Sequence, residues 1–202
     1  MTLEQGSLYI VSTPIGNLDD ITYRAVDILN KVDICASEDT RVSRILFKKY
    51  DISTKLISYH KFSEKSKINA LINLLKSGKD IALISDAGTP LISDPGQYLV
   101  EAAIENQIKT IPIPGPTSVI AALSVSGFNL ETFTFYGFFP RKLKEKKKIL
   151  KEIASSNGPS VIFESGRRLE KLIDTLSEEL HEKCKILIAR EMTKMHETLY
   201  RG

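Results

Sequence analysis

The chain has 202 residues, of which 42% are hydrophobic and 26% are charged. This composition is typical of a globular protein, and the length allows one large domain or two small ones with a substantial buried core. The net charge of +3 is too small to indicate a nucleic-acid partner by itself. No apolar run is long enough to span a membrane, and no signal peptide is recognisable. We therefore expect a cytoplasmic protein with no membrane partner.

The two cysteines, Cys35 and Cys184, lie far apart in the sequence, each within its own apolar stretch. This spacing argues against a disulfide framework and against a metal site, so we expect no bound metal. Both residues are predicted to be reduced and buried.

Short apolar runs alternate with amphipathic segments along the chain. The expected strands cover residues 8–12, 32–36, 56–60, 81–84, 109–113, 133–139, 160–164 and 185–190, and a last one begins at 197. The expected helices cover residues 21–32, 42–46, 68–75, 98–104, 119–124, 141–151 and 169–180. This alternation predicts the α/β class with a parallel sheet. We expect an N-terminal domain over residues 1–113 and a C-terminal domain over 114–202, with Pro114-Gly115-Pro116 at the junction.

The loop over residues 85–96 is unusually rich in Gly, Pro and Asp, and it follows a fully apolar strand. Ligands of open α/β sheets bind where strands end at their carboxyl edge. Glycines let the backbone approach a small molecule, and prolines restrict its freedom. The loop therefore favours a binding role over the alternative of a simple tight turn.

Further polar loops follow the first, second and fifth expected strands, at residues 13–20, 37–41 and 114–118. Right-handed crossovers place the loops that follow parallel strands on one edge of the sheet. We expect these loops and the 85–96 loop to line one cleft. The first loop lacks the G-x-G-x-x-G dinucleotide fingerprint, so taken alone it fits a turn as well as a site.

The Ser-Glu-Asp-Thr-Arg run at residues 37–41 places two carboxylates and an arginine at a strand end. It suits catalysis, and Asp39 also suits the N-cap of the following helix; the two roles are compatible. His60 follows the third expected strand and is either a catalytic residue or an ordinary surface residue.

The second half of the chain opens with an aromatic segment at residues 133–139 and continues into a basic helix. Seven basic residues and one acid lie between Arg141 and Lys151. Such a patch attracts phosphates, although a lysine-rich helix is also a common solvated face.

Five motifs fall in an order and spacing that resemble the tetrapyrrole methylase superfamily and, within it, the methyltransferases of small-subunit ribosomal RNA. They are the Ser-Thr-Pro-Ile-Gly-Asn-Leu run at 12–18, Ser-Glu-Asp-Thr-Arg at 37–41, Ser-Asp-Ala-Gly-Thr-Pro at 85–90, Pro-Gly-Pro-Thr-Ser at 114–118 and Ala-Arg-Glu-Met-Thr-Lys at 189–194. The resemblance covers nearly the whole chain.

The resemblance implies two α/β domains with S-adenosylmethionine in the cleft between them, and a homodimer. The implied reaction is methylation of the ribose 2′-hydroxyl of a cytidine in the decoding region of small-subunit (16S) ribosomal RNA, either free or in the assembled subunit. The motifs imply these cofactor-binding residues: Pro14, Ile15, Asp86, Ala87, Thr89, Thr117, Ser118 and Val119. The C-terminal domain is expected to be truncated at its end, because relatives continue beyond this length.

For this reaction we predict that Glu38 or Asp39 is the base or orients the nucleotide, with His60 as a lesser candidate. Arg41 is predicted to pair with a phosphate. Four basic residues of the second half are predicted to follow the RNA backbone: Arg141, Lys142, Arg167 and Arg168. Arg167 stands where the family usually has a histidine.

Two other hypotheses remain open at this stage. The first is a methylase of a tetrapyrrole or another small metabolite on the same fold, which predicts no RNA binding. The second is an RNA-binding module that holds the cofactor without transferring its methyl group.

Overall fold

A computed structural model describes residues 4–60, 64–180 and 184–202. The chain divides into two compact units, residues 1–118 and 119–202. In this division the 114–118 loop is held to the first unit. The Thr89 hydroxyl donates a hydrogen bond to the Pro116 carbonyl, 3.2 Å between oxygens.

A five-stranded parallel sheet forms the centre of the first unit, in the order β3-β2-β4-β1-β5. Its strands are β1 (Leu8–Val11), β2 (Ile34–Ser37), β3 (Lys55–Ser58), β4 (Ile81–Ile84) and β5 (Thr110–Ile113). The parallel sheet predicted from the strand–helix alternation is confirmed. Val32, where the expected helix and the expected strand overlap, ends the helix: its N–H donates to the Ile28 carbonyl, and β2 begins only at Ile34.

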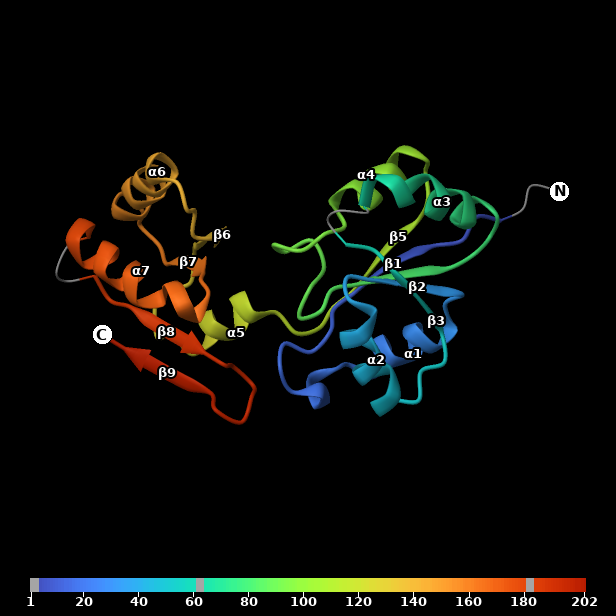
Figure 1. Cartoon of the computed structure of the whole chain (residues 1–202), viewed down its shortest axis with the longest axis horizontal. Helices are drawn as coiled ribbons and strands as arrows, with labels where there is room; N and C mark the ends of the chain where they lie inside the picture. The colour runs from blue at the N-terminus through green and yellow to red at the C-terminus, as the bar shows by residue number, and fades with distance from the viewer. Residues whose placement is uncertain (1–3, 61–63, 181–183) are drawn as a thin grey trace. The chain divides into compact units, whose positions relative to one another are not determined.

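Helices cover both faces of this sheet (Figure 1). They are α1 (Tyr23–Lys31), α2 (Thr40–Lys49), α3 (Glu64–Lys76) and α4 (Gln97–Glu105), and a short 3-10 helix η1 covers Leu18–Asp20. Successive residues of β4 explain the arrangement: Ile81 and Leu83 pack with α3 and α4, whereas Ala82 and Ile84 pack with α1 and α2. A strand buried on both faces must be apolar throughout, which is why the run 81–84 contains no polar residue.

The second unit contains two small sheets. β6 (Thr134–Phe138) pairs in parallel with β7 (Ser160–Phe163), and β8 (Leu187–Arg190) pairs in antiparallel with β9 (Thr198–Arg201). Its helices are α5 (Ser118–Ser124), which begins at the unit boundary, α6 (Leu143–Ala154) and α7 (Gly166–Glu179). Phe139, Leu150 and Leu172 form a compact core that joins the loop after β6 to α6 and α7.

The prediction for the two cysteines is half right. Cys35 is buried in β2, and this burial raises the pKa of its thiol, whereas Cys184 is exposed. Cys184 precedes the first residue of β8 by three positions and therefore lies outside the sheet that the apolar run forms. Within the described ranges, no helix is both long and apolar enough to cross a membrane.

Candidate active site

The loops that follow β1 and β4 are joined at the carboxyl edge of the parallel sheet. Thr13 N–H donates to the Gly88 carbonyl at 2.8 Å, and Gly88 N–H donates to the Thr13 carbonyl at 2.9 Å. The Thr13 hydroxyl also donates to the Ser85 carbonyl at 3.0 Å. Gly88 has a φ of 82°, a conformation that favours glycine. Two loops separated by about seventy residues are thus fixed against each other by backbone geometry.

The loop after β5 joins the same edge through Thr89 and Ser12. The hydroxyls of these two residues share a hydrogen bond, with 3.0 Å between the oxygens. A Cβ at Gly115 would lie 2.9 Å from the Ser12 Cβ, so only glycine allows this approach. The expected convergence of the loops after β1, β4 and β5 is therefore observed in the first unit.

Six of the eight residues implied to bind the cofactor lie on these three loops, and Ser118 is the first residue of α5. Pro14 and Ile15 follow β1, the motif around Asp86 follows β4, and Thr117 and Ser118 follow β5. Ile15 is directly beside Gly88, where an added Cβ would lie 3.4 Å from the Ile15 Cγ2. Val119 is buried in α5 and belongs to the second unit.

Asp39 and Asp86 connect the loop after β2 to the same edge. Asp39 N–H donates to Asp86 Oδ1 at 2.9 Å. The Asp39 carboxylate is the N-cap of α2, accepting from Arg41 N–H at 2.8 Å, so the predicted capping role is confirmed. The Arg41 guanidinium also binds this carboxylate, with 2.6 Å between Nη2 and Oδ2. These hydrogen bonds lower the pKa of Asp39 to about 2.

The neighbouring carboxyls have raised rather than lowered pKa values. Burial raises the pKa of Glu38, and the negative charges of Asp94 and Asp86 raise it further. Burial also raises the pKa of Asp86. Asp94 has a pKa raised to about 6, first by burial and then by the charge of Asp86, although a hydrogen bond from Ser85 opposes the shift. This edge therefore concentrates partly buried negative charge.

Asp94 was not among the residues to which the sequence assigned a role. Its signal was present, because it stands in the same Gly- and Pro-rich loop as Asp86. Sequence spacing alone does not reveal that the loop folds back to place Asp94 near Glu38, whose pKa it raises, and near Asp86, whose charge raises the pKa of Asp94. His60 lies two residues after the end of β3 and is partly buried.

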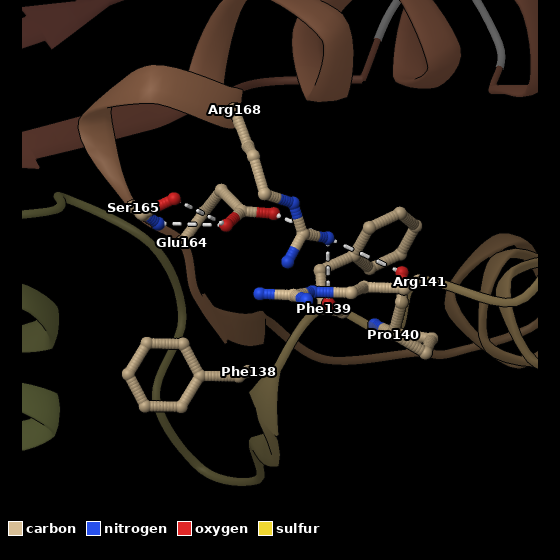
Figure 2. A pocket seen from close by; sticks show the side chains of 7 residues that line it. All are labelled: Phe138, Phe139, Pro140, Arg141, Glu164, Ser165 and Arg168. Atoms are coloured by element: carbon tan, nitrogen blue, oxygen red, sulfur yellow. Dashed lines mark hydrogen bonds and ion pairs between the residues drawn. The ribbon is translucent and has the colours of Figure 1, made fainter.

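The predicted RNA-contacting residues other than Arg41 lie in the second unit, at the ends of β6 and β7. Arg168 is anchored there (Figure 2): its Nη2 donates to the carbonyls of Phe139 at 2.9 Å and Pro140 at 3.3 Å. The same Nη2 lies 3.0 Å from Glu164 Oε2 in an ion pair. The guanidinium thus joins the loop after β6 to the loop after β7.

An open pocket of about 410 Å³ lies between these two loops. Arg141 and Arg168 both line it, together with Glu164. Arg141, Lys142 and Arg167 are exposed, and Lys142 pairs with Glu145 at 3.4 Å. Among the described residues, only Lys142 and Lys148 of the basic segment form ion pairs, and its other cations have no anionic partner within this part of the chain.

Comparison with known proteins places this chain among methylases. The family model described as Tetrapyrrole (Corrin/Porphyrin) Methylases matches residues 7–202. A protein of Vibrio cholerae named ribosomal RNA small subunit methyltransferase I is 46% identical over 192 residues, covering 95% of this chain and 67% of that protein. A protein of the same name from Thermotoga maritima is 43% identical over 197 residues, covering 98% of this chain and 88% of that protein.

Solved structures agree with the fold. The methyltransferase CobJ superposes with a TM-score of 0.74 at 18% identity, covering 98% of this chain and 86% of that one. The cobalamin biosynthetic enzyme cobalt precorrin-4 methyltransferase superposes with a TM-score of 0.67 at 19% identity, covering 97% of this chain and 84% of that one. The family match over nearly the whole chain, the relatives above 40% identity and the parallel sheet with its joined loops lead to one conclusion: this chain belongs to the tetrapyrrole methylase family.

Proposed function

We propose that this chain is an S-adenosylmethionine-dependent methyltransferase of small-subunit ribosomal RNA, and that it methylates the ribose 2′-hydroxyl of a cytidine in the decoding region. The observation that carries the proposal is the near full-length similarity, at 46% and 43% identity, to relatives named for this RNA. Enzymes named for corrinoid or porphyrin substrates are 15–19% identical to this chain. This difference favours the RNA substrate over a tetrapyrrole.

The carboxyl edge of the first unit fits a cofactor that carries positive charge. S-adenosylmethionine, when bound, supplies a methyl group on a positively charged sulfur, the methyl donor of this family. Asp86 and Asp94 are partly buried carboxyls with raised pKa values, and a nearby cation would stabilise their ionised forms. The loops carrying Ile15, Gly88 and Gly115 bring backbone close enough to hold a small molecule.

Glu38 is the better candidate for the base that takes the proton of the ribose hydroxyl. Its raised pKa makes its carboxylate a stronger proton acceptor at neutral pH than an ordinary glutamate. Asp39, in contrast, is held ionised by Arg41 and is committed to the start of α2. We therefore assign Asp39 a positioning role, through its N–H bond to Asp86. His60 remains a lesser candidate for the base.

The exposed cations of the second unit supply the phosphate contacts in this proposal. Arg141, Lys142 and Arg167 are exposed, and the basic helix α6 continues the positive charge. Affinity for RNA is therefore expected to fall as salt concentration rises. Arg41 is 85% exposed and reaches solvent beside Asp39, where it is positioned to pair with a phosphate.

The test is transfer of a labelled methyl group from S-adenosylmethionine to small ribosomal subunits that lack native methylation, followed by mapping of the labelled nucleotide. Free ribosomal RNA serves as a parallel substrate. We expect label on a single cytidine 2′-oxygen. Label on no nucleotide, with cofactor binding demonstrated by calorimetry, would contradict the proposal and favour an RNA-binding module without transferase activity.

A homodimer and a cytoplasmic location belong to the same proposal. Sedimentation of the purified chain tests the first, because a monomer across the micromolar range would contradict it. Fractionation of cells that express the tagged chain tests the second.

A further inference from the structure

We propose that the pocket between the loops after β6 and β7 holds one unstacked nucleotide of a single-stranded RNA, with its base stacked on the ring of Phe138. This inference rests on the proposed function and gives a binding site to the substrate. Phe138 was not predicted as a site residue. Its ring is largely exposed and lines this pocket.

Phe138 is the last residue of β6, and its side chain is 60% exposed although it lies next to the unit's core. The neighbouring Phe139 is only 2% exposed and packs in that core. An exposed phenylalanine ring forgoes the free energy that burial of its apolar surface would contribute. A single exposed apolar side chain is common on protein surfaces, but this ring also lines a pocket, where a ligand can cover it.

The backbone directs this ring outward. The pairing of β6 with β7 is irregular between Phe135 and Phe138, as at a β-bulge. Gly137 within this segment has a φ of 67°, a left-handed conformation that glycine adopts without strain. Bulges re-aim the side chains that follow them and are frequent beside functional sites.

The ring is also held in place from behind. The Phe138 and Phe163 rings meet edge to face, with 5.6 Å between centroids, and Phe163 meets Phe135 in the same way at 4.8 Å. A ring fixed by such contacts loses little conformational entropy when a base stacks on its open face. This rigidity suits a stacking platform for a nucleobase.

The charges of the pocket match a nucleotide. Arg141 and Arg168 contribute two positive charges and Glu164 one negative charge, so the lining carries one net positive charge. Arg168 is already engaged by Glu164 and two carbonyls, which leaves Arg141 as the exposed cation. In Figure 2 the Arg141 side chain extends across the pocket toward the side on which the Phe138 ring lies.

Size and surroundings favour RNA over a small apolar ligand. A volume of about 410 Å³ is within the range of small-molecule pockets, about 300–1,000 Å³, and it is open to solvent. Proteins that read single-stranded RNA stack its bases on aromatic rings and guanidinium planes, and they follow its backbone with positive charge. Phe138, Arg141 and the lysines of α6 provide these three elements within one short segment.

The experiment uses the full chain and a short single-stranded RNA that carries one 2-aminopurine, a base whose fluorescence is quenched by stacking. Phe138→Leu keeps an apolar contact with Phe163 but removes the aromatic face, and Phe138→Tyr keeps that face. Phe133→Ala is the matched control, because Phe133 is also an exposed phenylalanine (42%) and does not line the pocket.

We expect Phe138→Leu to weaken RNA binding about tenfold and to abolish the quenching, because stacking of one base on an aromatic ring contributes on this scale. Phe138→Tyr and Phe133→Ala should bind and quench like the wild type. Unchanged quenching in Phe138→Leu, or an equal loss in Phe133→Ala, would overturn the inference. The methyl-transfer assay separates the two proposals: if wild type labels RNA but Phe138→Leu has an unaltered KM for RNA, this inference alone fails.

Discussion

The two units present opposite chemistry at the ends of their parallel strands. In the first unit the strand ends carry partly buried carboxyls, Glu38, Asp86 and Asp94, enclosed by loops that are bonded backbone to backbone. In the second unit they carry an exposed aromatic ring and exposed cations around an open pocket. In the function that we propose, the same strand-loop-helix order serves a small cationic ligand in one unit and a polyanion in the other. Burial sets the difference, because it strengthens local charge effects, whereas exposed charge acts over the Debye length.

The largest expected effect is a loss of methyl transfer caused by a change in the first unit alone. Glu38→Gln should lower kcat for methyl transfer by about 100-fold or more, because it removes the proposed proton acceptor. Affinity for RNA should remain unchanged. Single-turnover kinetics measure the step, and Glu105→Gln, an exposed substitution on α4, is the control. Full activity in Glu38→Gln would show that another group accepts the proton of the ribose hydroxyl.

The rigidity of the acidic edge is tested by Gly96→Ala. Gly96 has a φ of 139°, and an added Cβ would lie 2.7 Å from the Leu83 Cδ2 in the core of the first unit. We expect a loss of about 2 kcal/mol in the free energy of unfolding, measured by urea denaturation. Gly166→Ala is the control, since an added Cβ there meets nothing within 4 Å. Equal stability of the two variants would show that this loop tolerates rearrangement.

The contribution of the second unit's positive charge to RNA binding is tested by removing lysines from one face of α6. Lys144, Lys147 and Lys151 are exposed and lie at helical spacing. Replacing all three with alanine should weaken RNA binding about tenfold and reduce the slope of log Kd against log salt by about 0.7 for each lost contact. The same change at Lys48, Lys55 and Lys76 of the first unit should leave the slope intact. A common slope for both triple variants would refute a specific role for α6.

The smallest effect is the pH dependence contributed by Asp94. Its pKa in the fold is about 6, above the 3.8 that is ordinary for an aspartate, so the fold favours its protonated form. Stability from this group is fully present at low pH and is lost as the pH rises through 6. Asp94→Asn should therefore be more stable than the wild type by about 1 kcal/mol at pH 8, after allowance for partial exposure, and equally stable at about pH 3, below the unfolded-state pKa. Urea denaturation at both pH values measures the difference in the free energy of unfolding between the variant and the wild type. An equal difference at both pH values would show that titration of Asp94 does not cause it.

The elements that the sequence predicted well are those whose residues leave few alternatives. β4 is apolar at all four positions, and the breakers that follow it allow only a loop, so both the strand and its binding loop could be anticipated. The convergence of the loops followed from the handedness of parallel crossovers. The capping role of Asp39 followed from local chemistry alone.

Features that depend on distant packing could not be predicted. The raised pKa of Asp94 requires the fold of the 85–96 loop, which includes left-handed backbone at Leu91 and Ser93. In the sequence, nothing distinguishes Arg168 from the other basic residues of this half. In the structure, its guanidinium is fixed by carbonyls 28 and 29 residues away. The outward direction of Phe138 depends on a bulge that strand periodicity does not encode.

The strand order of the first unit also has a consequence for synthesis of the chain. β1 lies between β4 and β5, where Leu8 pairs with Ile81 and with Thr110. The first strand to leave the ribosome therefore has no neighbour until more than seventy further residues have been translated, and the sheet closes only when β5 emerges. Such long-range pairing slows folding and leaves apolar edges open in the meantime. We therefore expect the nascent first unit to expose apolar strand edges until residue 113 is free of the exit tunnel.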